Sequence, residues 1–260
     1  ALNGTFTGDV QMADTPKLSG NMALSIPSLR ALASKAGTEL PPSTASGAIF
    51  ERTEISGQVS GTAERIIFSD AKGGLDALNG HGLFTLDMTP ARPKLTGNLT
   101  MAGLDVRPYM AAWSAQKPEG EIVPWSEAPL NLTGLRALDA NIDFTSPNVK
   151  MNRLALGQST LKTVLDNGVL VADMPNIALY GGKGVGKATL DVTTDVPTVA
   201  LNADLNLLNG QNFLSAVAGF TKASGQAGTE ISITGRGTSQ AAIMRSLDGT
   251  GGFSLKDGQI

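Results

Sequence analysis

The sequence predicts a mainly β protein, in which repeated antiparallel β-hairpins form a large bent or rolled sheet and a few short helices pack against it. Three observations predict this class. Apolar and polar residues alternate in many short segments, 31 glycines and 13 prolines punctuate the chain, and one sequence unit recurs along it. Alternation with a period of two is typical of strands, and frequent turn residues favour many short strands over long helices.

The recurring unit begins at four places, each time with a glycine-rich segment. These segments are LNGTFTGDVQ from Leu2, LNGHGLFTLD from Leu78, YGGKGVGKATLD from Tyr180 and LDGTGGFSLKDGQI from Leu247. In the first three copies a short turn and a second alternating segment follow, and the turns contain Pro16, Pro93 and Pro197. Proline between two strands need not donate a hydrogen bond to the ladder. Each unit is therefore predicted to be a β-hairpin followed by a small helix.

The alternation is clearest in the third copy. Val199, Leu201, Ala203, Leu205 and Leu207 are predicted to point to one face of a strand, and the asparagine and aspartate residues between them to the other. A sheet with one apolar and one wet face follows from this pattern.

Three short helices are predicted from apolar residues spaced three and four apart. The apolar residues are Leu29, Leu32 and Ala33 in the first, Phe213, Leu214, Val217 and Ala218 in the second, and Ala242, Ile243 and Leu247 in the third, which spans Ser239 to Leu247. Each apolar side could lie against the sheet.

A run of hairpins is predicted between the second and third copies. Its strands are Ala140–Thr145, Lys150–Leu156, Leu161–Leu165 and Val169–Ala172, and Asn167-Gly168 is a strong two-residue turn signal. The domain organisation predicted is a β-rich repeat region at 1–115, a proline-rich loop at 116–129 and a second β region at 130–260. A shorter loop is predicted from Leu40 to Ser46.

Composition excludes several classes of function. A formal net charge of −3 and the absence of a Lys/Arg cluster argue against nucleic acid as a partner. The chain has no cysteine, which excludes disulfides and thiolate chemistry. No segment has the roughly 18 uninterrupted apolar residues of a membrane span, and no signal peptide is recognisable. Strand-like patterns at Leu2 and Ile260 suggest a piece cut from a longer protein.

No catalytic, metal-binding or cofactor-binding residue is predicted. His81 is interpreted as an exposed turn residue, since no cysteine and no G-x-S-x-G elbow accompany it. Gly181 to Ala188 matches G-x-x-x-x-G-K, but Ala188 stands where a phosphate loop needs Ser or Thr, and a strand pattern follows instead of a helix. This segment is interpreted as the start of a repeat. The carboxylates are dispersed, and Glu119, Glu121 and Glu127 are interpreted as a solvated surface.

Several ordered motifs resemble the C-terminal region of the AsmA family. They are L-x-x-L-x-A-x-x-x-F from Leu135 to Phe144, the segment Leu179-Tyr180-Gly181-Gly182, and S-L-x-G-x-G-x-F-x-L-x-D-G-x-I from Ser246 to Ile260. The upstream P-K-L-x-G pairs and the segment from Leu104 to Tyr109 are similar as well. The resemblance covers nearly the whole chain and is strongest from about Leu130 onward.

The resemblance implies a non-catalytic envelope protein of Gram-negative bacteria. It implies an inner-membrane anchor formed by an N-terminal helix outside this sequence, a periplasmic location, and a role in outer-membrane assembly and phospholipid homeostasis. Long bent sheets of this kind resemble lipid-transfer proteins with a groove for acyl chains. The expected lining of such a groove includes Val199, Leu201, Ala203, Leu205 and Leu207, and the expected partners are phospholipid acyl chains and other envelope proteins.

Two other interpretations stay open. The chain could be a structural assembly factor that binds envelope proteins through exposed sheet edges, without lipid. It could also be a hydrolytic or carbohydrate-active enzyme, for which a buried carboxylate pair would be required. For any one residue of the apolar alternation, an ordinary core position is the competing explanation.

Overall fold

The computed structural model describes residues 2–12, 14–35, 40, 48–109, 125–130, 132–151 and 154–259. The chain forms two compact units, Ala1–Glu121 and Ile122–Ile260. Both are built mainly of antiparallel strands, which confirms the predicted fold class. The predicted loop at 116–129 spans the division between the units, and its residues 116–124, like residues 41–46 of the shorter loop, lie outside the described residues.

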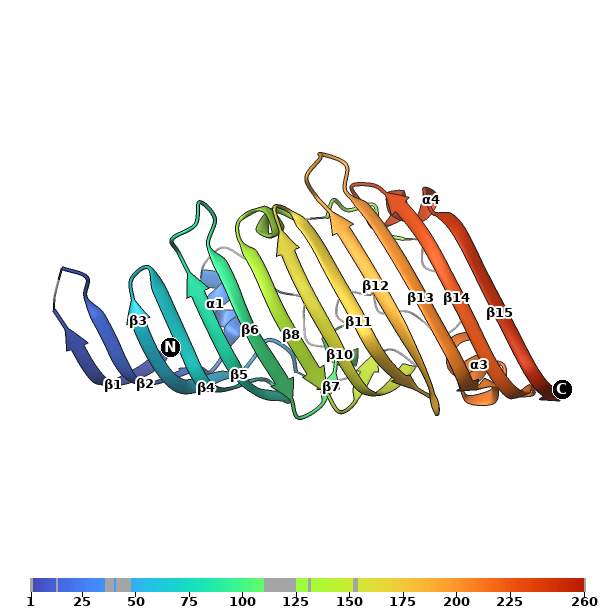
Figure 1. Ribbon diagram of the computed structural model, residues 1–260, viewed down its shortest axis with the longest axis horizontal. Coiled ribbons are helices and arrows are strands. Elements are labelled where there is room, and N and C mark those ends of the chain that lie inside the picture. Colours follow the sequence, from blue (N-terminus) through green and yellow to red (C-terminus); the bar gives the residue numbers. More distant parts are fainter. Residues whose placement is uncertain are drawn as a thin grey trace. The chain divides into compact units, whose positions relative to one another are not determined.

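The strands of the first unit between Asn3 and Met101 form a meander, in which each strand pairs with the next along the chain (Figure 1). Alternating side chains let a strand bury one side, although β1 (Asn3–Gln11) is exposed along its whole length, and short turns make sequential antiparallel pairing the simplest connection. Its strands are β1 (Asn3–Gln11), β2 (Lys17–Ile26), β3 (Thr53–Thr62), β4 (Arg65–Leu75), β5 (Leu78–Asp87), β6 (Lys94–Met101) and the short β7 (Leu104–Asp105).

The second unit has the strand order β8-β10-β11-β12-β13-β14-β15, and β9 pairs with the beginning of β10. All of these pairings are antiparallel. The strands are β8 (Asp139–Ser146), β9 (Val149–Met151), β10 (Leu154–Asp166), β11 (Val169–Leu179), β12 (Gly182–Asp191), β13 (Thr198–Asn209), β14 (Ser224–Arg236) and β15 (Asp248–Gln259).

In the described part of the chain, short helices connect strands: α1 (Leu29–Lys35), η1 (Thr133–Arg136), α3 (Gly210–Ala218) and α4 (Gln240–Arg245). The start of α3 is capped by Asn209, whose side chain accepts a hydrogen bond from the Asn212 amide at 2.9 Å. Its end is set by Gly219, which has the left-handed backbone conformation. Ser239 caps α4 in the same way as Asn209 caps α3.

The repeat is visible in the turns as well as in the strands. After β5, the Asp87 carboxylate accepts hydrogen bonds from the amide and hydroxyl of Thr89 at 2.9 and 2.6 Å. After β12, Asp191 accepts the same two bonds from Thr193 at 2.8 and 2.6 Å. These bonds lower the pKa of both carboxyl groups. The two copies thus leave their first strand through the same side-chain turn.

Some local predictions are wrong. The segment Lys150–Leu156, predicted as one strand, contains the end of β9 and the start of β10, which pair with each other. Two consecutive polar residues, Asn152-Arg153, interrupt the alternation there, so the apolar residues before and after them belong to different strands. In contrast, the Asn167-Gly168 turn is confirmed, because both residues have positive φ, at 49° and 80°.

The helices bury less than their spacing predicts. No residue of α1 is buried, and Leu32 is exposed. Among the described apolar side chains of α3, Phe213 is buried while Val217 is exposed, and in α4 the buried residue is Ala241. Helices of about two turns have room for one anchoring residue on the sheet, so their remaining apolar residues stay at the margin of the contact.

Gly184 of β12 lies at a position that has no room for a larger side chain. Gly184 lies opposite Leu205, and a methyl group built on it would lie 2.3 Å from the Leu205 Cδ2 atom and 2.5 Å from the Asp204 carbonyl oxygen. We expect Gly184→Ala to lower the free energy of unfolding by about 1–3 kcal/mol through overpacking. Gly252→Ala on β15 is the control, because nothing lies within 4 Å of its added methyl group. Urea denaturation measures both, and equal effects would contradict this explanation.

Candidate functional site

The second unit has one continuous apolar face, which its strand register assembles. Residues directly opposite each other in an antiparallel sheet point to the same side. Leu201 is opposite Ala188 on β12 and Ile233 on β14, and Ala188 is in turn opposite Ala172 on β11. The neighbouring rows add Leu170, Leu190 and Val199 on one side and Met174, Ala203 and Ile231 on the other.

This face contains a shallow hollow of about 270 Å³. Its lining is almost wholly apolar and consists of Leu170, Ala172, Ala188, Thr189, Leu190, Val199, Ala200, Leu201, Ile233 and Leu247. The residues from Leu170 through Ile233 in this set are half-buried. The surface is therefore apolar without being fully covered by the chain itself.

Helices cover the two ends of the face and leave its middle open. At one end of the strands, Phe213 of α3 packs in a buried cluster with Ile177, Leu179, Leu208 and Ala227. At the other end, Leu247 and the α4 residue Ile243 lie over Gly235, within 3.1–3.3 Å of where its methyl group would be. Figure 1 shows α3 and α4 at opposite ends of β14. Between these two ends lie the cross-strand rows of side chains that contain Leu201 and Ala203. Neither residue belongs to the buried cluster around Phe213, and Leu201 lines the open hollow.

The structure places the predicted groove residues on two sides of β13. Val199, Leu201, Ala203 and Leu205 lie half-buried on the apolar face, and the first two line the hollow. Leu207 is 58% exposed and has a positive φ of 57°, because the register shifts between Leu205 and Leu208. Leu208, fully buried, takes the place on the apolar face that strict alternation assigns to Leu207.

Other residues of the apolar face are not found by reasoning on one strand at a time. Ile231 and Ile233 on β14 alternate as regularly as the β13 residues, so their pattern was available in the sequence. Leu170, Ala172, Ala188 and Leu190 lie in shorter alternating segments. Which of these face Leu201 depends on strand register, and sequence periodicity alone does not give it.

The opposite face of the second unit is polar and charge-paired. Lys162 lies directly across from Asp143 on one side and Asp173 on the other, and Asp173 is also opposite Lys187. Opposite charges at directly paired positions stabilise a sheet by a few tenths of a kcal/mol to about 1 kcal/mol each. This ladder also favours the register that assembles the apolar face.

The first unit repeats this two-faced organisation. An apolar hollow of about 350 Å³ lies over β3 to β6 and is lined by side chains that include Ile55, Phe68, Leu75, Phe84 and Met101. The cross-strand pairs Val59 with Phe68 and Phe68 with Phe84 lie on this same face. Each unit therefore presents an apolar sheet face with a hollow in it.

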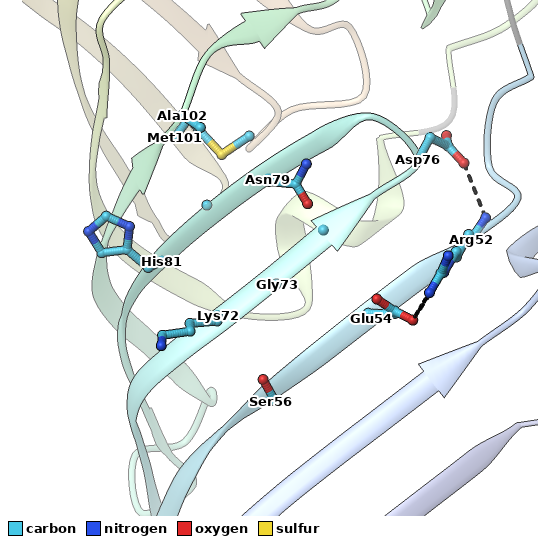
Figure 2. A pocket seen from close by; sticks show the side chains of 12 residues that line it. Arg52, Glu54, Ser56, Lys72, Gly73, Asp76, Asn79, His81, Met101 and Ala102 are labelled. Carbon is cyan, nitrogen blue, oxygen red and sulfur yellow. Dashed lines mark hydrogen bonds and ion pairs between the residues drawn. The ribbon is translucent and has the colours of Figure 1, made fainter.

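A second hollow of the first unit, of about 600 Å³, is lined by several polar side chains together with glycines, Met101 and Ala102 (Figure 2). At one side the Asp76 carboxylate accepts hydrogen bonds from the amides of Phe50, Glu51 and Arg52 at 2.7, 2.9 and 3.2 Å. It also accepts a bond of 2.8 Å from the Tyr109 hydroxyl. Asp76 lies in the turn between β4 and β5. Its hydrogen bonds link this hairpin to the segment 50–52 and to Tyr109.

His81 lies in the same hollow. It is exposed, as predicted, but it is a residue of β5 and not a turn residue. It is directly opposite Lys72 on β4. Glu127, predicted to be at a solvated surface, is exposed and forms an ion pair with Arg245 of α4 at 2.6 Å, which lowers the pKa of its carboxyl group.

Because of Tyr109, the stability of the first unit is expected to fall at alkaline pH. Burial, followed by the hydrogen bond to Asp76, raises the pKa of its phenol far above the usual value of about 10. A raised folded-state pKa contributes stability below the unfolded value, and this is lost as the pH rises above about 10. We expect the urea midpoint to fall more steeply between about pH 9 and pH 11 in the native protein than in Tyr109→Phe. Equal slopes would contradict this role.

The described residues contain no group of three or more His, Cys, Asp or Glu side chains arranged to hold a metal ion. Within the same part of the chain, the buried polar residues are Ser146 and Ser239, so the buried carboxylate pair required by the hydrolase interpretation is not found there. No described helix has both the length and the apolar composition needed to span a membrane.

The family model described as "AsmA family" matches residues 22–260, which is nearly the whole chain. No significant match was found among curated proteins or among solved structures. Members of the matched family are generally non-enzymatic proteins associated with the bacterial envelope. The chain, with its repeated hairpins and its two-faced sheets, belongs to the AsmA family.

Proposed function

We propose that this chain is a non-enzymatic periplasmic module that binds phospholipid acyl chains along the apolar faces of its sheets. In this proposal it acts in outer-membrane biogenesis and in phospholipid homeostasis or transport, from a protein anchored in the inner membrane. The observation that supports it most directly is the open, half-buried apolar face of the second unit, with α3 and α4 at its two ends.

The chemistry of this face suits a hydrocarbon chain. Each methylene group removed from water contributes roughly 0.8 kcal/mol, so a row of small and medium apolar side chains can hold an acyl chain without directional contacts. The side chains that line the hollow are mainly aliphatic, and its polar contribution comes from Thr189 and backbone atoms. An exposed apolar surface of this kind favours a bound apolar partner.

The experiment is native mass spectrometry of the purified protein, prepared without harsh detergent, together with lipid extraction. Phospholipid at a fixed ratio to protein is the expected result. Protein that carries no lipid and takes up none from added phospholipid would contradict the proposal.

A structural assembly role is the second candidate, and a specific observation supports it. Along β15 every residue except Leu255 is exposed among those described, and Phe253 is 53% exposed. In the described structure β15 pairs with β14 on one side only. A strand edge with free backbone groups is suited to adding a strand from another protein. This candidate predicts capture of an envelope protein with no lipid present.

A further inference from the structure

The polar hollow of the first unit contains a row of hydrogen-bond donors without a carboxylate in it. Ser56, Lys72, His81 and Thr100 are directly opposite one another on β3, β4, β5 and β6. All four are exposed, and the first three line the hollow. Figure 2 shows Lys72 and His81 projecting side by side from neighbouring strands.

The two carboxylates of this hollow are already engaged. Glu54 pairs with the guanidinium group of Arg52, whose Nε donates to it at 3.0 Å. Asp76 accepts three backbone amides and the Tyr109 hydroxyl. Neither carboxylate is opposite Lys72, which faces Ser56 and His81 across the strands. The ammonium group of Lys72 therefore adjoins donors and lies outside these two networks.

Such a row is favourable for an anion. Lys72 has Ser56 and His81 directly opposite it and no carboxylate at either position to balance its positive charge. An oxyanion beside Lys72 would accept a charge-assisted hydrogen bond from its ammonium group and further bonds from the His81 imidazole N–H and the Ser56 hydroxyl. Gly74, two residues after Lys72 and therefore on the same face of the sheet, carries no side chain and leaves room beside the row.

We propose that the Lys72–His81 row binds a phosphate group, carried either by a small soluble phosphate ester or by the headgroup of an anionic phospholipid. Lys72 supplies the fixed positive charge, and His81 and Ser56 supply further donors. This site lies on the polar side of the sheet, on the face opposite Ile55 and Phe68. Lys72 also adjoins the apolar hollow of this unit, but the acyl-binding hollow proposed for the second unit shares no residue with the row, so either function can fail without the other.

The test is a titration of ¹⁵N-labelled protein with glycerol 3-phosphate, followed by NMR. A parallel flotation assay uses phosphatidylcholine vesicles with and without phosphatidylglycerol. We expect shifts at the amides around residues 56, 72 and 81. We expect the double variant Lys72→Gln, His81→Gln to weaken binding at least about ten-fold, equivalent to about 1.4 kcal/mol. Lys72→Arg should retain it. Lys162→Gln is the control, because Lys162 lies between two aspartates and should not contribute.

Each outcome assigns the ligand or overturns the site. Binding of glycerol 3-phosphate without vesicle binding identifies a soluble phosphate ester. Flotation only with phosphatidylglycerol vesicles, lost in the double variant, identifies a lipid headgroup. No binding in either assay, or equal binding by the double variant and the native protein, overturns the proposal. Acyl-chain uptake by the double variant confirms that it is folded and tests the other function independently.

Discussion

Replacing Leu201 by aspartate is expected to abolish most acyl-chain binding by the second unit. Leu201 lies in the middle of the apolar face, opposite Ala188 and Ile233, and lines its hollow. A carboxylate there would lose much of its hydration whenever a lipid chain covered it, at a cost of several kcal/mol. We expect at least about a ten-fold rise in the dissociation constant, since 1.4 kcal/mol corresponds to ten-fold. Displacement of a fluorescent fatty acid measures it, and Leu205→Asp should act in the same direction.

The matched control is the neighbouring residue on the other face. Asn202→Asp introduces the same carboxylate one position along β13, where the side chain is exposed and lies opposite Lys187. Its fatty-acid affinity should equal that of the native protein. Circular dichroism and urea denaturation show whether Leu201→Asp is folded. A folded Leu201→Asp protein with unchanged affinity would exclude this face as the acyl-binding surface.

Replacing Asp76 by asparagine is expected to cause the largest loss of stability in the first unit. The Asp76 Oδ2 atom accepts bonds from the Phe50 amide and the Tyr109 hydroxyl, and Oδ1 accepts bonds from the amides of Glu51 and Arg52. An asparagine amide group at either position would direct its own N–H groups at an amide N–H. Hydrogen bonds to a charged group contribute about 1.5–3 kcal/mol each, so we expect a loss of about 2–4 kcal/mol.

Urea denaturation, followed by hydrogen exchange at residues 50–52, measures this effect. Asp9→Asn is the control, because Asp9 is an exposed residue of β1 opposite Ser19 and undergoes the same change of charge. Asp9→Asn should leave stability within about 0.5 kcal/mol of the native value. Tyr109→Phe removes one of the four bonds and should lie between the two variants. An Asp76→Asn protein as stable as Asp9→Asn would show that this network is dispensable.

The predictions that held rest on local chemistry. The Asn167-Gly168 turn needs positive φ at two residues, and those residue types provide it wherever they occur. Gly181 to Ala188 begins a strand, as the repeat indicates, with Lys183 and Lys187 opposite the polar residues Asn206 and Asn202. The prolines at 16, 93 and 197 do lie between paired strands. In each case the preference belongs to the residues themselves and does not depend on a partner strand.

The predictions that did not hold depend on contacts across strands. Strict alternation places Leu207 with Leu205, but the shift in register before Leu208 turns Leu207 outward. His81 was interpreted as an exposed turn residue, but it lies within β5, and the glycines on either side of it are opposite Met101 and Leu99 on β6. The structural role of Asp76 was not predicted, because its four hydrogen-bond partners lie 24 to 33 residues away in the sequence.

The sequence by itself determined that this is a repeated β-hairpin protein with apolar and polar faces, and its ordered motifs indicated the AsmA family. It did so because turn preferences and a period of two are properties of neighbouring residues. Tertiary structure decided which rows of side chains meet, where register shifts turn a residue to the other face, and which part of the apolar surface α3 and α4 leave open. Those features depend on pairing between distant strands, because a shift of one residue in register reverses the face of every side chain that follows.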